Sequence, residues 1–286
     1  MQVRFWGTRG SIAAPGPTTM RYGGNTSCVE VRLDDDTLII FDAGTGIRAL
    51  GEALLAQPGP VHAHLFLSHA HWDHIQGIPF FTPAYIAGTE LTILGPEHGH
   101  LTLEKIVTGQ MRSPYFPIPM HAMAAKIEFV KLGERSMVEL PNGATVEAGV
   151  LNHPGCTLGY RLTANGKVLA YTTDNEPFGE AAVSRHLVKP SSHTSLVRDA
   201  DLLIQDAQYT PEEYAPHRLG WGHSTYLDAL QIAQQAQVKR LVLFHHDPSH
   251  SDTDIDHIVT QCQAQIAQEG LDLECLGAAE GAVLVL

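Results

Sequence analysis

The chain has few basic residues, few cysteines and no long apolar run. Lys and Arg total 18 against 31 Asp and Glu, which gives a formal net charge of −13 over 286 residues. This charge and the lack of a Lys/Arg cluster disfavour a long nucleic acid as the partner. The apolar runs are only as long as strands, so no membrane-spanning helix is expected. Met1–Trp6 lacks the apolar core of a signal peptide, and we therefore expect a cytoplasmic protein.

The four cysteines are spread along the chain and form no CxxC pair. Reduced and mostly buried thiols are therefore expected at Cys28, Cys156, Cys262 and Cys275. Cys156 lies three residues after His153, a predicted metal ligand discussed below, and could approach the metal. A packed thiol is the preferred interpretation.

The length and the hydrophobic content of 44% suit one globular domain, residues 1–286, with a substantial core. Helical spacing of apolar residues predicts helices over Gly46–Gln57, His98–Gln110, Ser224–Gln237 and Asp252–Glu269, the last two capped by Ser224-Thr225 and by Asp252. Strands are predicted at Val3–Trp6, Cys28–Leu33, Leu38–Phe41, Val61–Leu67, Leu91–Leu94, Ile127–Val130, Thr145–Val150, Leu158–Leu162, Val168–Tyr171, Leu202–Gln205, Leu241–Phe244 and Ala282–Leu286. This order predicts two packed sheets with helices outside.

The most informative stretch directly follows the predicted strand Val61–Leu67. His69, His71, Asp73 and His74 place three imidazoles and one carboxylate within six positions. These side chains bind Zn²⁺, Mn²⁺ or Fe²⁺, but so short a segment cannot easily wrap around one tetrahedral ion. We therefore expect two ions side by side, as in two-metal hydrolases. A His-rich surface loop without metal is the alternative.

Three later residues at strand ends complete the ligand set. His153 follows Thr145–Val150, Asp174 follows Val168–Tyr171, and His245 follows Leu241–Phe244. Asp174 is expected to bridge the ions, because a carboxylate has two oxygens. The expected assignment is one ion at His69, His71 and His153 and a second at Asp73, His74 and His245. His246 is the alternative last ligand, and we otherwise expect it to support the ligands or to contact the substrate.

The order His-x-His-x-Asp-His, His, Asp, His resembles the metallo-β-lactamase fold superfamily. It is most similar to the phosphodiesterase branch with ribonuclease Z and the phosphonate-pathway cyclic phosphodiesterases. Gly7–Ser11, Asn25–Cys28 and Ile40–Gly44 add to the resemblance, which covers essentially the whole chain and implies that Asp42 supports the metal loops from behind. It implies an α/β (α+β) fold, a four-layer αβ/βα sandwich of two mixed β-sheets flanked by helices. Two divalent ions, zinc first and manganese or iron otherwise, would lie at one edge, and a homodimer is an option.

The segment Gly220–Thr225 resembles the Gly-His-Ser-Thr signature of the ribonuclease Z-like branch. The resemblance implies that His223 protonates the leaving alkoxide and that Asp206 orients the imidazole and favours its charged form. With Asp73, these two are the expected catalytic residues. Helix capping is the alternative for His223, although Ser224 and Thr225 cap better.

Two further segments are candidates for substrate contacts. Arg9, Ser11 and the backbone N–H groups of Gly7–Ser11 could receive a phosphate oxygen, or this segment could be only a tight turn. Phe116, in the Pro-rich loop or lid Ser113–Pro119, and Trp221 could stack on a nucleobase. Such aromatic side chains also anchor loops to the core or to a second subunit.

Ribonuclease Z enzymes that bind transfer RNA often carry a long arm between the third His and the bridging Asp. Only twenty residues separate His153 from Asp174, which leaves no room for an arm. We therefore expect a dinuclear phosphodiesterase for a small diester, first a 3′,5′-cyclic nucleotide, with a metal-bridging hydroxide as nucleophile and His223 as general acid. The alternatives are a ribonuclease Z-like or cyclic-dinucleotide phosphodiesterase and, from another class, a non-catalytic metal- or nucleotide-binding sensor.

Overall fold

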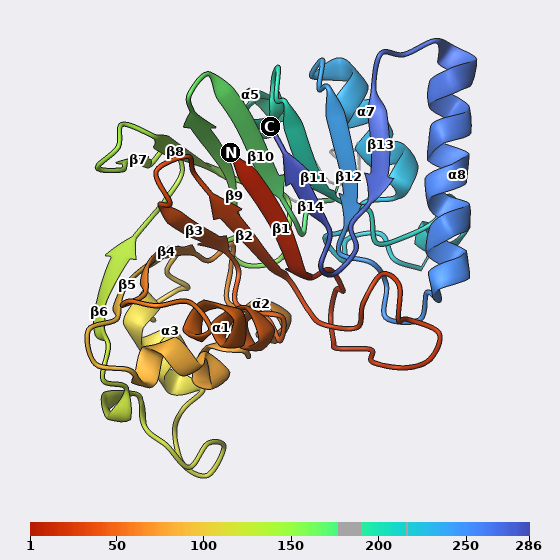
Figure 1. Ribbon diagram of the computed structural model, residues 1–286. Coiled ribbons are helices and arrows are strands. Elements are labelled where there is room, and N and C mark those ends of the chain that lie inside the picture. Colours follow the sequence, from red (N-terminus) through yellow and green to blue (C-terminus); the bar gives the residue numbers. More distant parts are fainter. Residues whose placement is uncertain (177–189, 216) are drawn as a thin grey trace.

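Two mixed β-sheets pack face to face in this computed structural model, which describes residues 1–176, 190–215 and 217–286 (Figure 1). Each sheet has 7 strands, in the orders β14-β1-β2-β3-β4-β5-β6 and β13-β12-β11-β10-β9-β8-β7. Strands β3 to β6 run parallel in the first sheet, and β10 to β13 run parallel in the second. The remaining neighbours are antiparallel. The predicted sandwich of two mixed sheets flanked by helices is confirmed.

Every predicted strand has a counterpart within two residues of its expected ends. The first sheet consists of β1 (Gln2–Gly7), β2 (Cys28–Arg32), β3 (Leu38–Phe41), β4 (His62–Phe66), β5 (Glu90–Gly95), β6 (Lys126–Lys131) and β14 (Val283–Val285). The second consists of β7 (Met137–Glu139), β8 (Thr145–Val150), β9 (Leu158–Ala164), β10 (Lys167–Thr172), β11 (Leu202–Asp206), β12 (Arg240–Phe244) and β13 (Glu274–Gly277). β7 and β13 were not predicted, because each is short and lacks a continuous apolar run.

Three apolar layers hold the sandwich together. The central layer lies between the sheets, where Phe41 of β3 stacks on Tyr160 of β9 and Tyr171 of β10. A second layer lies between the first sheet and α1 (Ile47–Leu55), and a third lies between the second sheet and α7 (Tyr226–Gln235) and α8 (Asp252–Glu269). Because the central layer contains side chains from both sheets, the two halves share one core.

The remaining α-helices of the described residues are short: α2 (Trp72–Ile75), α3 (Leu103–Gly109), α5 (Pro190–Val197) and α6 (Pro211–Tyr214). Single 3₁₀ turns lie at Ile78–Phe80, Thr82–Tyr85 and Met120–Ala122. The helix predicted from His98 begins only at Leu103, after the N-cap Thr102. Thr225 caps α7 as expected, whereas α8 is capped by Ser251 rather than Asp252. No helix among the described residues is long and apolar enough to cross a membrane.

Candidate metal centre and active site

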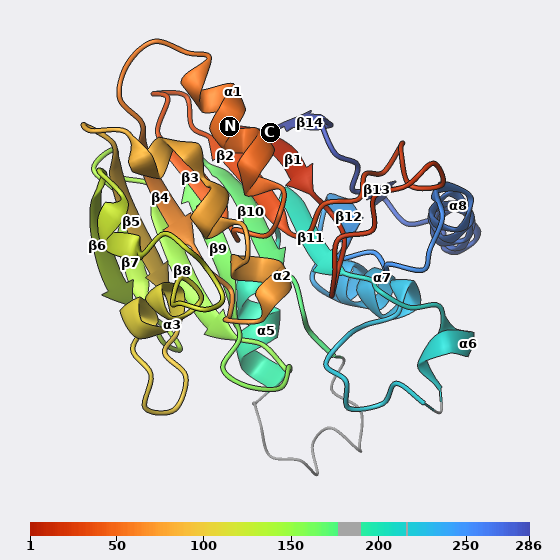
Figure 2. The same cartoon turned by 90° about the horizontal axis from the view of Figure 1, so that it is seen from below.

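The candidate ligands lie on the segments that follow β4, β8, β10 and β12, with Asp73 and His74 in the short helix α2. These segments meet at one edge of the sandwich, at the bottom of Figure 1 and toward the viewer in Figure 2. The motif from His69 to His74 comes from the first sheet, whereas His153, Asp174 and His245 come from the second. The site is therefore assembled between the two sheets.

The first ligand group consists of His69, His71, His153 and Asp174, whose ligand atoms lie within 4.8 Å of one another. His153 Nε2 is 3.1 Å from His71 Nδ1. Asp174 Oδ2 is 3.5 Å from His69 Nε2 and 3.6 Å from His153 Nε2. These are the residues that the sequence assigns to one ion.

The second ligand group consists of Asp73, His74, Asp174 and His245. Asp73 Oδ2 lies 3.1 Å from Nε2 of both His74 and His245. Asp174 Oδ1 lies 3.2 Å from the same two nitrogens. The two carboxylate oxygens of Asp174 thus face different groups, which is the arrangement that a bridging carboxylate requires.

The imidazoles are oriented for metal binding by contacts on their opposite nitrogens. Nδ1 of His74 lies 2.8 Å from Asp42 Oδ2, Nδ1 of His153 donates to the Gly222 carbonyl, and Nδ1 of His245 lies 3.1 Å from Gln208 Oε1. Each contact leaves Nε2 directed at the ligand group, as in known metal sites. His69 Nε2 is buried and has no hydrogen-bond partner among the described residues. An orphaned buried nitrogen beside carboxylates fits a metal ligand.

The electrostatics of the groups also suit a cation. Burial lowers the pKa of His69, and that of His153 to about 4, so both rings are neutral at pH 7 and keep a lone pair free. Burial alone would raise the pKa of Asp73 and Asp174, but the neighbouring histidines hold both well below the usual range. Burial alone would lower the pKa of His74, yet the carboxylates of Asp73 and Asp174 raise it well above the ordinary value. The negative charge of these two carboxylates, which raises the pKa of His74, also attracts metal cations.

Asp42 supports the metal loop from behind, at the position that the resemblance assigns to it. Its Oδ1 accepts from the Ser68 backbone N–H at 2.7 Å, and its Oδ2 accepts from the Ser68 and Tyr171 hydroxyls at 2.8 and 2.7 Å. With the contact to His74, the buried carboxylate ties the motif to the central core. Gly44 is needed because a Cβ there would lie 2.2 Å from the Asp73 carbonyl oxygen.

Besides Ser11, whose φ is 61°, three buried residues at the site have left-handed backbone conformations, which cost non-glycine residues about 1–3 kcal/mol each. They are Asp42, Asp174 and His245, with φ of 59°, 52° and 61°. The surrounding hydrogen bonds keep these residues in their strained conformations. Such strain concentrates at functional sites and indicates that side-chain direction matters here.

The structure brings His223 and Asp206 together beside the ligands. His223 Nδ1 lies 2.7 Å from Asp206 Oδ2, and both side chains are buried. The His223 ring stacks on His245 at a centroid distance of 5.0 Å and lies edge-on to His153 at 5.0 Å. Burial alone would lower the pKa of His223, but Asp206 outweighs it and the pKa rises to about 9. The imidazole is thus protonated at neutral pH, as a general acid must be.

Sequence reasoning missed Glu176, which holds the loop that carries His223. Its buried carboxylate accepts from the backbone N–H groups of Gly220 and Gly222 at 2.7 and 3.0 Å, and from the Tyr214 hydroxyl at 2.6 Å. Gly222 has φ of 92°, and a Cβ there would lie 2.2 Å from His153 Nδ1. The only signal in the sequence is that Glu176 follows Asp174 by two residues.

Gln208 was also missed, since a glutamine after a strand carries no chemical signature. It contacts His245 as described above, and its Nε2 donates to Asp247 Oδ2 and to Ser11 Oγ, both at 3.3 Å. The Ser11 backbone N–H donates to Asp73 Oδ2 at 2.8 Å. Ser11 therefore lies beside the candidate ligands, where its N–H holds Asp73, and its contact with a phosphate oxygen stays a prediction.

Arg9 and His246 lie elsewhere than predicted. The Arg9 guanidinium is fully buried and donates to the carbonyls of Gly23, Asp247 and His250. This contradicts the predicted phosphate contact, because the side chain is buried away from solvent and its Nε and Nη1 hold loops together, while Nη2 has no partner among the described residues. His246 is buried with Nε2 donating to the Ala278 carbonyl at 2.9 Å, so it faces away from the ligand groups. The predicted role of His246 beside the substrate or the ligands is wrong.

The two aromatic candidates differ in exposure. Trp221 is 55% exposed, and the Arg218 guanidinium lies over its ring at 4.8 Å. Phe116 is half-buried, packs on the outer apolar layer of the first sheet and meets Phe80 edge-on at 5.5 Å. Phe116 therefore anchors the Pro-rich loop, which was the alternative interpretation.

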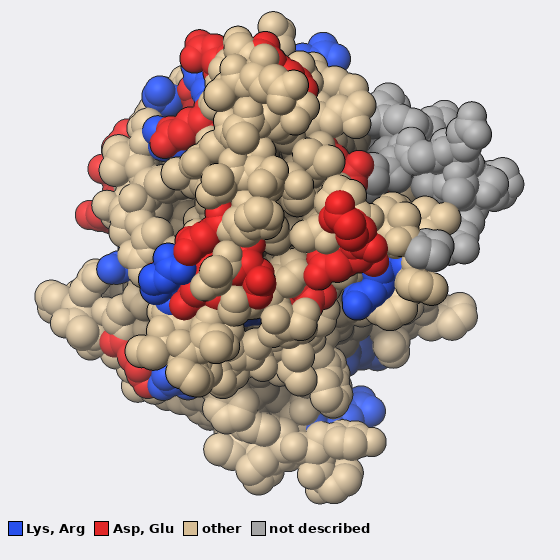
Figure 3. Space-filling view, turned by 90° about the vertical axis from the view of Figure 1, so that its right-hand side faces the viewer, with Lys and Arg blue, Asp and Glu red and all other residues tan. Residues whose placement is uncertain are grey.

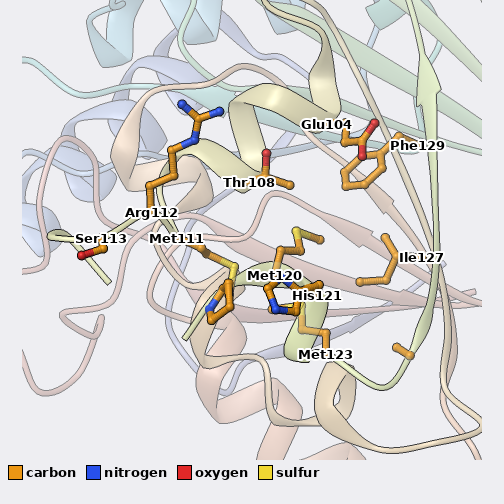
Figure 4. Close-up of a pocket in the computed structure, with 12 residues that line it drawn as sticks. Glu104, Thr108, Met111, Arg112, Ser113, Met120, His121, Met123, Ile127 and Phe129 are labelled. Carbon is orange, nitrogen blue, oxygen red and sulfur yellow. The ribbon is translucent and has the colours of Figure 1, made fainter. Parts of the chain in front are cut away.

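Two cavities lie next to elements of the first sheet. One of about 390 Å³ is lined by His69 and His71 and thus adjoins the first ligand group. A larger one of about 760 Å³ lies between α3 and β6, with the side chains of Met111, Met120 and Phe129 at its walls (Figure 4). None of the candidate ligands lines the larger cavity, so the smaller one belongs to the site.

Comparison with known proteins agrees with this geometry. Residues 37–246 match the model of the β-lactamase superfamily domain. Ribonuclease Z from Methanosarcina mazei is 29% identical over 88% of this chain and 89% of its own length. Among solved structures, a diphosphatase from the PhnP family has a TM-score of 0.66 at 19% identity, covering 100% of this chain and 97% of its own. Zn²⁺-bound PqqB from Methylobacterium extorquens has a TM-score of 0.68 at 18% identity, with full coverage of both chains. The chain belongs to the β-lactamase superfamily and has the metallo-β-lactamase fold.

Proposed function

We propose that this protein is a phosphodiesterase with two divalent ions that hydrolyses a small phosphodiester, first a 3′,5′-cyclic nucleotide. The observation that carries the proposal is the buried His223–Asp206 pair beside two ligand groups that share Asp174. When bound there, divalent ions lower the pKa of water and neutralise charge on phosphate oxygens. Zinc suits the His/Asp donors best, with manganese or iron as alternatives.

The ligand residues have defined roles in this proposal. His69, His71 and His153 would hold one ion and Asp73, His74 and His245 the other, with Asp174 between them. The Nδ1 contacts described above fix the ring orientations, so little reorganisation is needed when an ion binds.

His223 would act as the general acid. Its Nδ1 proton is held by Asp206 at 2.7 Å, so its Nε2 carries the proton that can leave. As the phosphorus–oxygen bond breaks, this proton passes to the departing alkoxide, and Asp206 stabilises the imidazolium beforehand. Tyr209, edge-on to the His223 ring at 5.9 Å, helps to hold it in place.

Two observations support a small substrate. The chain between His153 and Asp174 forms the compact hairpin of β9 and β10, so no arm for transfer RNA extends from it. Acidic side chains also gather in several groups on the face that carries α8, with smaller groups of basic ones between them (Figure 3), and the chain has a formal net charge of −13. Such a surface repels a polyanion.

A ribonuclease Z-like activity is the second candidate, and the similarity to the Methanosarcina mazei ribonuclease Z favours it. It would use the same ligand groups and the same acid. Binding to an RNA would weaken steeply with salt, because each phosphate contact releases counterions.

Metal analysis followed by a substrate panel tests the proposal. We expect two ions per chain and turnover of cyclic nucleotides and of nitrophenyl phosphodiesters. The panel also contains a cyclic dinucleotide, an RNA with a 3′ trailer, a β-lactam and a glutathione thioester. Faster cleavage of the RNA, with salt-dependent affinity, would replace the small-diester proposal by the second candidate. Tight nucleotide binding without product over hours would indicate a sensor.

A further inference from the structure

The cavity of about 390 Å³ beside the first ligand group has no role in the mechanism above. Its walls come from three loops, those after β4, β5 and β8. Besides His69 and His71 it is lined by Ala70, Pro96, Glu97, His98, Pro154, Gly155 and Cys156. Its volume falls in the usual range for small-ligand pockets.

The walls of this cavity are largely apolar, and no Lys or Arg lines it. The exposed His98 imidazole lies over the backbone of Gly155, where an added Cβ would be 3.4 Å from the His98 ring. Pro96 and Pro154 add rigid apolar surface. The Glu97 carboxylate pairs with Lys131 Nζ at 2.6 Å. A second phosphate would find no free cation among these residues, whereas an uncharged ring would find a stacking partner.

We propose that this cavity binds the base of a nucleotide substrate, a flat uncharged heteroaromatic ring, while the phosphodiester lies at the ligand groups. The inference rests on the proposed function and specifies its substrate class as nucleotide diesters. His69 and His71 belong to both the cavity and the first ligand group, so base and phosphate are accommodated side by side. His223 does not line the cavity, so a base bound there leaves the acid free to reach the leaving oxygen.

A pair of substrates with one leaving group tests the inference. Thymidine 5′-nitrophenyl phosphate and methyl nitrophenyl phosphate both release nitrophenolate, and only the first carries a base. Removing an aromatic stacking partner costs about tenfold in affinity or more. His98→Ala should therefore raise KM for the thymidine ester about tenfold and leave the methyl ester unchanged. The matched control is His100→Ala, because His100 is exposed in the same loop and does not line the cavity.

Equal KM values for the two esters in the wild type, or equal effects of His98→Ala on both, would overturn the inference. If neither ester is turned over by metal-loaded wild type, the proposed function fails instead. Binding at the cavity is then decided by a second measurement that requires no turnover.

The second measurement is alkylation of Cys156, the cysteine that lines the cavity and is half-buried, whereas Cys28, Cys262 and Cys275 are buried. Burial raises the pKa of the Cys156 thiol, so iodoacetamide is applied at alkaline pH. Thymidine 5′-monophosphate should slow alkylation several-fold in the wild type and much less in His98→Ala. Inorganic phosphate, which lacks a base, should not protect. Protection by phosphate alone, or none by the nucleotide, would overturn the inference.

Discussion

Asp42→Asn should destabilise the protein and weaken metal binding although Asp42 is no candidate ligand. The substitution keeps the size of the side chain, removes its charge and turns one acceptor oxygen into a donor. Asp42 is fully buried and accepts from the Ser68 N–H, two hydroxyls and the His74 ring at 2.7 to 2.8 Å. Whichever way the amide points, its NH₂ faces a donor.

The magnitude follows from these contacts. Hydrogen bonds to a charged group contribute about 1.5–3 kcal/mol each, against about 1 kcal/mol for neutral ones, and an unpaired buried donor costs about 1–3 kcal/mol. At the low ends of these ranges, weakening three bonds by about 0.5 kcal/mol each, losing about 1.5 kcal/mol with the fourth and leaving its donor unpaired at about 1 kcal/mol gives about 4 kcal/mol, so we expect a destabilisation of roughly 3–5 kcal/mol. For a chain of this length about 2 °C of Tm corresponds to 1 kcal/mol, so Tm should fall by roughly 6–10 °C. The dissociation constant for metal should rise about 10- to 100-fold, because His74 loses its orienting partner.

Scanning calorimetry of the metal-free protein, in the presence of a chelator, measures the change in Tm. Titration calorimetry with metal measures the change in its dissociation constant. The control is Asp272→Asn, an exposed carboxylate, which should change neither. Unchanged Tm and metal affinity in Asp42→Asn would refute the reasoning that this carboxylate holds the metal loop.

Three further substitutions test the site. Asp174→Ala or His74→Ala should abolish turnover in metal-replete buffer, and near-wild-type rates in either variant would show that the ligand assignment is wrong. His223→Ala should slow diesters with alkyl leaving groups by about 10²-fold or more, and nitrophenyl diesters far less, since nitrophenolate needs no proton; equal losses would remove His223 from the acid role. Glu176→Gln should reproduce this dependence on the leaving group in weaker form, because it loosens Gly222 and the acid loop, and should also weaken metal binding, since the Gly222 carbonyl orients His153; a uniform loss on all substrates at saturating metal would contradict that positioning role.

Much of the fold was predictable because its strands are continuous apolar runs. Leu38–Phe41, for example, is predicted with its observed bounds, since all four residues are buried. β7 escaped prediction because only Val138 of its three residues faces the core. Helix α2 spans just four residues, and its start is set by the loop geometry of the site rather than by helical periodicity.

The candidate ligands were predictable because each follows a strand and carries a metal-binding group. Arg9 shows the limit of such reasoning. Its sequence context suggests an exposed phosphate contact, but carbonyls from Gly23 and from two residues more than 230 positions away converge on its guanidinium. Only the folded chain reveals those acceptors. Glu176 and Gln208 escaped for the opposite reason, because their partners are backbone groups and rings that no local pattern identifies.

Each ligand group draws residues from both sheets, and this has a consequence for unfolding. An ion bound in either group would be a reversible cross-link between the halves of the chain, because separating the sheets destroys the site. Metal at 100 times its dissociation constant would add about 2.7 kcal/mol to the stability per site. Backbone amides in β3 and β10 lie on opposite sides of the central core. Their hydrogens should then exchange about 100-fold more slowly for each site that metal fills. Slower exchange in one sheet alone would show that the halves open independently.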